Sequence, residues 1–169
     1  MDASTSKLIL FTLGEGPDHQ GRLIEDIRGW NNEALEYTHD YIQWLFPIPE
    51  KGEHNDFAPA LTETSMLWFS RIPDLREQQK RSFNRMLNFF GLKAVESGFD
   101  AGIHLNERHH PWLRRFDHNH RRISRIIRSL HLCHQPELAA SFRQAVTRIG
   151  QQQGDVSDAT VRFWNEATA

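Results

Sequence analysis

The sequence predicts an all-α protein: a single helical domain over residues 1–169, built from about six to seven amphipathic helices. Three observations predict it. Apolar residues recur at spacings of three and four in most segments, alternating apolar and polar residues are almost absent, and Pro or Gly stands at the ends of the periodic segments. The length suits one hydrophobic core, and no linker-like stretch divides the chain.

The helical segments have recognisable start and stop signals. Thr62 is placed to cap the third of them, and Pro73 and Gly91 bound the fourth. Two stretches lack a helical pattern: we expect the apolar run at 7–13 to be a strand or docking segment, and residues 92–117 to be a long loop. The predicted helices lie at about 22–30, 32–45, 61–72, 73–90, 118–133, 136–150 and 156–167.

The composition excludes several classes of protein. Hydrophobic residues make up 38% and charged residues 25%, with a net charge of −2, so a nucleic-acid partner is not favoured. No run of about 20 apolar residues is present to cross a membrane. Cys133 is the single cysteine, which excludes an internal disulfide and a thiolate zinc site. We expect a cytoplasmic protein, and the sequence leaves its oligomeric state open.

The stretch "EYTHDYIQWLFP" (36–47) combines polar and aromatic residues in one predicted helix. At helical spacing Glu36, His39 and Gln43 share a face. A Glu-x-x-His pair of this kind delivers a carboxylate and an imidazole to one metal ion in helical bundles. The alternative is a buried His39 whose ring bonds Glu36 or a backbone carbonyl, and the pattern favours this alternative because the Glu-x-x-His pair occurs only once.

The stretch "FDHNHRR" (116–122) supplies two further histidines at the start of a predicted helix. Asp117 or Asn119 can cap that helix, which leaves His118 at its beginning and His120 inside it. Two imidazoles separated by one residue chelate a metal if the backbone is extended, and otherwise take part in hydrogen bonds across a helix contact. The candidates for metal ligation or acid–base catalysis are therefore Glu36, His39, His118 and His120.

The same helix carries a run of arginines. Arg121, Arg125 and Arg128 form one stripe, close to a helix N-terminus whose unpaired N–H groups favour an anion. The alternative is a solvated basic face. Aromatic residues such as Trp44 are typical both of a core and of a peptide groove. The residues that we expect to contact a ligand are Tyr41, Gln43, Trp44, Asn119, Arg121, Arg122 and Arg125.

Four stretches of the chain together resemble a known family. They are "LEYTHDYIQWLFP" (35–47), "HNDFAPALTE" (54–63), "SFNRMLNFFGL" (82–92) and "HNHRRISRIIRSL" (118–130), in this order. They are similar to the conserved domain of the opioid growth factor receptor family over roughly residues 22–150. The chain stops soon after this region, without the long repetitive tail of the receptor, so we expect a short member of the family.

The resemblance implies an all-helical domain. It also implies a receptor-like function, since the animal members are described as receptors for an enkephalin-type opioid peptide. Two functions follow as hypotheses. The first is a ligand- or peptide-binding module that takes a peptide or a small anionic ligand. The second is a metal-dependent or general acid–base enzyme that uses the histidine and glutamate candidates, for which a divalent metal would be the cofactor, although none is favoured.

Overall fold

The structure, a computed structural model, describes residues 1–52 and 55–168. Residue 54, with which the second family-like stretch begins, lies outside the described residues. Within the described residues there are nine α-helices, one short 3₁₀-helix and one two-stranded sheet. The expectation of a helical protein is thus confirmed in a coarser form. The sheet corrects the prediction of a strictly all-α fold, and the helices are more numerous than predicted and most of them are shorter.

The chain forms two compact units. The N-terminal unit comprises Met1–Arg85 together with Leu132–His134, and the C-terminal unit comprises Met86–His131 and the chain from Gln135 onward. One helix, α6 (Pro73–Phe89), contributes residues to both. The organisation as a single domain stays a prediction.

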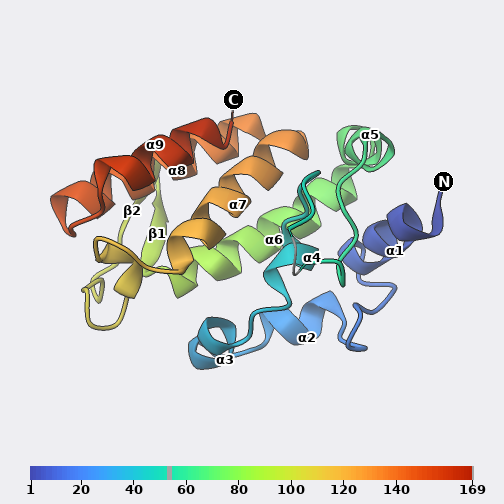
Figure 1. Ribbon diagram of the computed structural model, residues 1–169, viewed down its shortest axis with the longest axis horizontal. Helices are drawn as coiled ribbons and strands as arrows, with labels where there is room; N and C mark the ends of the chain where they lie inside the picture. The colour runs from blue at the N-terminus through green and yellow to red at the C-terminus, as the bar shows by residue number, and fades with distance from the viewer. Residues whose placement is uncertain (53–54, 169) are drawn as a thin grey trace. The chain divides into compact units, whose positions relative to one another are not determined.

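The N-terminal unit contains five helices before α6, drawn from blue to green in Figure 1. The first of them is a helix where a strand was one of the two expectations, so the expected strand is wrong. This helix forms because the Asp2 carboxylate accepts a hydrogen bond of 2.7 Å from the Thr5 N–H, an N-cap that the apolar run alone did not indicate. The five are α1 (Ala3–Thr12), α2 (Ile24–Arg28), α3 (Asn32–Tyr37), α4 (Ile42–Leu45) and α5 (Glu63–Arg71).

The predicted helix 32–45 is in fact interrupted. Helix α3 ends where Thr38 adopts an extended conformation, with φ −98° and ψ 131°, and α4 starts four residues later. The Tyr41 hydroxyl donates a 2.7 Å hydrogen bond back to the Leu35 carbonyl oxygen, and both side chains are fully buried. Tyr41 therefore folds the chain back on the end of α3, and residues 38–41 serve as a link between two short helices.

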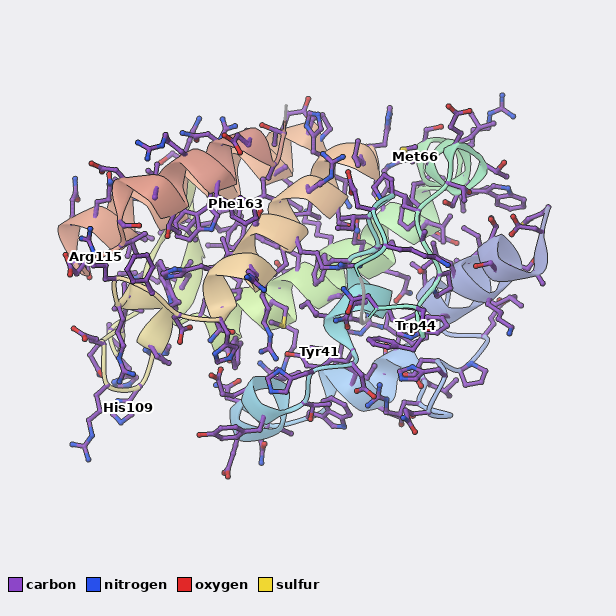
Figure 2. All side chains as sticks on the ribbon, viewed as in Figure 1. Tyr41, Trp44, Met66, His109, Arg115 and Phe163 are labelled. Atoms are coloured by element: carbon purple, nitrogen blue, oxygen red, sulfur yellow. The ribbon has the colours of Figure 1, made fainter. Side chains whose placement is uncertain are left out.

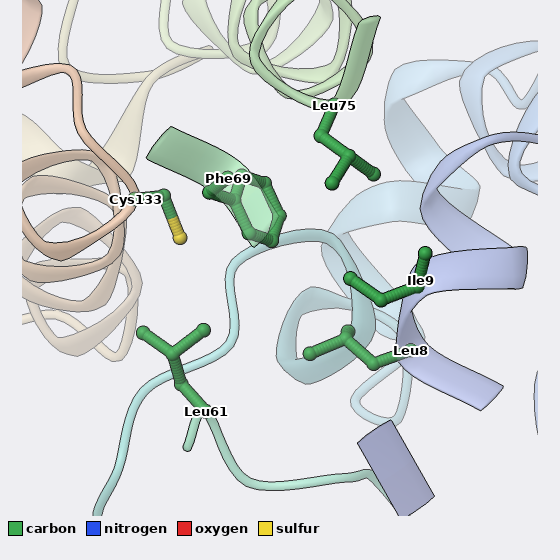
Figure 3. Close-up of a cluster of buried hydrophobic side chains, with 6 residues drawn as sticks. All are labelled: Leu8, Ile9, Leu61, Phe69, Leu75 and Cys133. Atoms are coloured by element: carbon green, nitrogen blue, oxygen red, sulfur yellow. The ribbon is translucent and has the colours of Figure 1, made fainter. Parts of the chain in front are cut away.

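A cluster of apolar side chains forms the core of the N-terminal unit (Figure 3). Leu8 and Ile9 come from α1, Phe69 from α5, and Leu75 from the first turn of α6. Thr62 caps α5 as predicted, its hydroxyl accepting from the Ser65 N–H. The remaining members of the cluster are Leu61 and Cys133.

Helix α6 agrees closely with its prediction. Pro73 is its first residue, and Gly91, just beyond its end, has a φ of +75°. The predicted inward stripe is buried throughout, and it consists of Leu75, Gln79, Phe83, Met86, Leu87 and Phe90.

The C-terminal unit contains the sheet, in the region predicted to be a loop. Strands β1 (Leu92–Val95) and β2 (Gly98–Ala101) form an antiparallel hairpin in which Leu92 pairs with Ala101 and Val95 pairs with Gly98. Strands of four residues are too short for a periodic pattern to reveal. Beyond them lie η1 (Pro111–Leu113), α7 (Asn119–Leu132), α8 (Pro136–Gln152) and α9 (Asp158–Glu166), with α8 in contact with β2 (Figure 1).

Two tryptophans anchor the core of the C-terminal unit. The indole N–H of Trp112 donates to the Phe90 carbonyl oxygen over 2.8 Å, and that of Trp164 donates to the His120 carbonyl oxygen over 3.0 Å. Both rings are almost completely buried, so each needs this partner for its polar atom. The apolar face predicted for α7 is confirmed, because Ile123, Ile126, Ile127 and Leu130 are fully buried. Among the helices of the described chain, none has the length and apolar character needed to span a membrane.

Candidate binding site

The predicted Glu36–His39 pair does not share a helix face. Glu36 lies in α3, whereas His39 lies in the link that follows and has an exposed side chain. The helical spacing on which a metal-binding Glu-x-x-His pair depends is therefore absent. The alternative prediction, a buried helical His39, is wrong for the same reason. Gln43, the third member of the expected face, is buried, and its amide group donates to the His39 carbonyl oxygen over 3.2 Å.

The two histidines of "HNH" occupy different environments. The Asp117 carboxylate, one of the two caps that the sequence left open, accepts a hydrogen bond from the Asn119 N–H, and the His118 side chain is about half exposed. His120 is buried inside α7, and its Nε2 lies 2.6 Å from the Trp112 carbonyl oxygen. Because a carbonyl oxygen only accepts, this Nε2 carries the proton. The extended backbone that a His118–His120 chelate requires is not present.

Nothing in the described chain brings the enzyme candidates together as a metal site. No group of three or more His, Cys, Asp or Glu side chains suited to a metal ion occurs in residues 1–52 and 55–168. A lone imidazole held to a backbone carbonyl, as at His120, is a structural group. The hypothesis of a metal-dependent or acid–base enzyme thus has no support from the geometry.

Most of the residues predicted to contact a ligand are buried. Tyr41 has no exposed surface, and Asn119 and Arg122 are buried on α7, where Arg122 Nη1 donates to the Asn119 side-chain oxygen over 3.3 Å. Arg121 is exposed and Arg125 partly exposed. Contact of these two arginines with an anion stays a prediction.

Trp44 is different, because it lines a pocket. The pocket has a volume of about 520 Å³ and lies wholly within the N-terminal unit. Such a volume is in the range of small-ligand sites. We call it the Trp44 pocket; its lining includes Lys7, His19, Trp44, Lys51, Asp56 and Phe57, with small residues of the first turn of α1 and two prolines.

Three rings in contact form one wall of the Trp44 pocket. The His19 imidazole lies nearly in the plane of the Trp44 indole, with the two rings edge to edge and their centroids 6.1 Å apart, and Phe57 stacks on His19 at 4.7 Å. The Trp44 indole N–H donates to His19 Nδ1 over 3.0 Å. Since an indole nitrogen only donates, Nδ1 is the acceptor and the proton of a neutral His19 is on Nε2. The tautomer of His19 is therefore set by Trp44 (labelled in Figure 2).

A network of charged groups holds this wall in place. His19 Nε2 lies 3.1 Å from an oxygen of Asp40, whose other oxygen accepts from Arg22 Nη1 over 3.0 Å. Arg22 Nε donates to the Asp18 carboxylate over 2.7 Å, and its guanidinium covers the Trp30 ring at 5.2 Å. Such a multiply bonded guanidinium has little rotational freedom, so the imidazole orientation is fixed from both sides.

The network lowers the pKa of Asp40. Burial by itself raises the pKa of this carboxyl, but the hydrogen bond and positive charge of Arg22, with a smaller contribution from His19, outweigh it and hold the pKa below its ordinary value. Asp40 is therefore an ionised anchor of the pocket wall.

The local sequence explains why the network forms here. Asp18 is buried, and its second oxygen accepts from the N–H groups of Gln20 and Arg22, each over 2.9 Å, in a turn closed by its own side chain. Gly21 supplies the φ of +78° that this turn requires. The ion pair of Arg22 with Asp18 is therefore formed within one short turn of the chain.

Sequence reasoning missed His19, Phe57 and the two lysines. The turn signal around Pro17 and Gly21 was visible, but the partner of His19 is 25 residues away in the chain, and no local spacing encodes that contact. The pocket has a flat apolar wall and charged groups at its edge. That arrangement suits the reversible binding of a ligand.

The comparisons with known proteins agree with the resemblance. The sequence profile of the family described as "Opioid growth factor receptor (OGFr) conserved region" matches residues 16–167, a longer region than the expected 22–150. No solved structure matches the chain significantly.

Curated relatives are similar over about two thirds of the chain. The opioid growth factor receptor of Rattus norvegicus is 39% identical over 116 residues, which cover 65% of this chain and 20% of the receptor. The receptor of Homo sapiens is 36% identical over 119 residues, covering 65% of this chain and 17% of the receptor. The opioid growth factor receptor-like protein 1 of Rattus norvegicus is 34% identical over 119 residues, or 65% and 24% of the two chains. The chain thus spans about a fifth of the length of these relatives.

Proposed function

We propose, since this chain belongs to the opioid growth factor receptor conserved-region family, that it is a receptor-like binding module which receives its ligand in the Trp44 pocket. The relatives are named as receptors, and the matched region is the part of them that this chain represents. Because these relatives are named as opioid growth factor receptors, a peptide is the ligand class that we propose for this chain.

The observation that carries the proposal is the fixed ring wall of the pocket. His19 has Trp44 as partner at one ring nitrogen and Asp40 at the other, and it is stacked on Phe57. Its orientation is therefore set without any ligand. A preformed wall lowers the entropy cost of binding, because no side chain has to be ordered when the ligand arrives.

The sequence contributes a reason for the location. Trp44 lies in "YIQWLFP", one of the family-like stretches, and Phe57 and Asp56 lie in "HNDFAPALTE". Two of the four stretches that carry the resemblance therefore meet at one pocket.

The test is a titration of the isotope-labelled chain with an enkephalin-type peptide, followed by nuclear magnetic resonance. We expect the indole N–H signal of Trp44, assigned with a Trp44→Phe variant, to shift in a saturable way. Phe57→Ser should weaken binding by about tenfold or more, since it removes one ring of the wall.

Phe163→Ser is the matched control, because Phe163 is a partly exposed phenylalanine of α9 that does not line the pocket (Figure 2). It should leave the affinity unchanged. Shifts confined to residues outside the Trp44 pocket, or equal losses in both variants, would refute the location of the site. No saturable shift anywhere would refute binding of this peptide.

A further inference from the structure

We infer that the Trp44 pocket selects a ligand group that carries an aromatic ring and a carboxylate together. This inference rests on the proposed function and names the chemistry of its ligand. The ring would pack against the wall of His19, Trp44 and Phe57, and the carboxylate would lie between the ammonium groups of Lys7 and Lys51. The carboxylate can be a peptide C-terminus or an acidic side chain next to the ring, since both present the same chemistry to the pocket.

The apolar part of the inference follows from the rings. Aromatic groups prefer stacked or edge-to-face contacts with other rings, at centroid separations of about 4.5–7 Å. The wall already holds three rings within these separations, Phe57 on His19 at 4.7 Å and His19 beside Trp44 at 6.1 Å, so that His19 and Trp44 form one flat surface. Pro17, Ala58 and Pro59 add further apolar surface to the lining. A flat apolar group gains more from such a wall than a flexible chain does.

The charged part follows from an inventory of the ionic groups that line the pocket. Lys7 and Lys51 are exposed, and within the described part of the chain neither takes part in an ion pair. Asp18 also lines the pocket, but its carboxylate is occupied by Arg22 and two backbone N–H groups. Asp56 is the other carboxylate of the lining. It has no hydrogen-bond or ion-pair partner among the described residues, so its negative charge offsets part of the positive charge of the lysines.

The helix end at the pocket adds to the preference. Ala3 and Ser4, in the first turn of the ten-residue α1, are part of the lining. The N-terminus of a helix favours negative charge within its first turn. The Asp2 carboxylate caps the helix and offsets part of this positive potential, and the two lysines add to it. A ligand carboxylate beside the start of α1 would meet both this helix end and the two lysines, neither of which has an ion-pair partner among the described residues.

The probes are small molecules that separate the ring from the charge. N-acetylphenylalanine has both, its amide has the ring without the charge, and the amide of N-acetyl-aspartyl-phenylalanine has its charge on a side chain. Affinities are measured from the Trp44 indole N–H shift and compared at two salt concentrations. We expect N-acetylphenylalanine to bind about fivefold more tightly than its amide, with the difference shrinking at high salt.

Lysine variants test whether Lys7 and Lys51 cause the preference for a carboxylate. Lys7→Gln and Lys51→Gln should each reduce the carboxylate preference, and the double variant should abolish it, while binding of the neutral amide is unchanged. Asp56→Asn should strengthen the preference. Lys80→Gln is the matched control, because Lys80 is an exposed lysine of α6 outside the pocket.

The outcomes separate this inference from the proposed function. Equal binding of the acid and its amide, or a preference that survives in the double lysine variant, overturns the inference and leaves a ring-binding pocket. A Trp44 signal that no probe shifts overturns the inference and the pocket location together. Tighter binding of N-acetylphenylalanine than of the dipeptide amide assigns the carboxylate to a C-terminus, and the reverse order assigns it to an acidic side chain.

Discussion

His120 and His118 differ in what they contact, although only Asn119 separates them in the chain. The His120 ring donates to the Trp112 carbonyl oxygen over 2.6 Å and meets the Trp164 ring edge to face, with centroids 5.6 Å apart. The His118 side chain is about half exposed. The two positions are therefore expected to respond differently to the same substitution.

We expect His120→Phe to lower the free energy of unfolding by about 1–3 kcal/mol, because it leaves a buried carbonyl oxygen without this donor. His118→Phe should change it by about 0.5 kcal/mol or less, as is usual for surface positions. Urea unfolding of both variants provides the measurement. Losses of equal size would contradict the assignment of His120 as the structural histidine.

The lowered pKa of Asp40 predicts a dependence of stability on pH. A carboxyl whose pKa is lower in the folded state stabilises the fold above its unfolded-state pKa, about 4, and this contribution is lost as the pH falls through the folded-state value. The free energy of unfolding of the wild type should therefore exceed that of Asp40→Asn at neutral pH. The difference should decrease below about pH 4. A difference that stays constant from pH 7 to pH 2 would show that the Asp40 charge is not the cause.

Single residues were predicted well where the cause is local. Thr62 caps α5 as expected, and Asp117, one of the two caps expected for α7, accepts from the Asn119 N–H. Such caps are predictable because they depend on residues two or three positions away. Trp44 was among the residues predicted to contact a ligand, and that contact stays a prediction. Its partner His19 was not among those residues, because the contact between the two depends on how two distant segments pack.

At the scale of elements, the turn after α6 depends on one close approach. Gly91 has a φ of +75°, and a Cβ at this position would lie 2.6 Å from Nε2 of His110. The His110 ring is partly buried, and burial lowers the pKa of its imidazole. A side chain at position 91 would therefore have two costs. It would be strained in the left-handed backbone conformation, and its Cβ would clash with the His110 ring.

We expect Gly91→Ala to lower the free energy of unfolding by about 2–4 kcal/mol, from about 1–2 for the left-handed backbone and a similar cost for the clash. His110→Ala opens the space. The double variant Gly91→Ala/His110→Ala should therefore be more stable than the sum of the two single changes indicates, by about 1 kcal/mol. Thermal unfolding of the four proteins measures this coupling. Strict additivity would contradict the contact between Gly91 and His110.

The same scale shows where sequence patterns succeed and fail. Helix α6 was predicted from Pro73 to its end because a long amphipathic stripe and both terminal signals agree. The helix predicted at 32–45 is interrupted because Tyr41 bonds back to Leu35, a side-chain contact that competes with the helical periodicity. The hairpin of β1 and β2 was missed because four-residue strands contain too few alternations to count.

At the scale of the whole molecule, the N-terminal unit is not a continuous piece of chain. It takes Leu132–His134 from the end of α7 and the two residues that follow, and Cys133 packs in one cluster with Leu8 and Phe69. The family profile matches residues 16–167 and thus includes both parts of this unit beyond its first helix. A fragment cut after Arg85 would lack part of its own core.

We expect the fragment 1–85 to have no cooperative unfolding transition at temperatures where the complete chain is folded, because its core has an unfilled space where Cys133 belongs. Circular dichroism during heating measures this. The complete chain serves as the control, and a single transition in it is what the predicted single domain requires. A fragment that melts as sharply as the complete chain would show that residues 132–134 are dispensable for the N-terminal unit.

Cys133, because it is enclosed, provides a way to measure how often the core opens. It is the single cysteine of the chain, and its side chain is fully buried among apolar neighbours. A thiol reagent that cannot enter a packed core reacts only during the moments when that core opens. The labelled fraction therefore grows at the rate of opening, and a mass spectrum taken at intervals counts these openings in the unaltered protein.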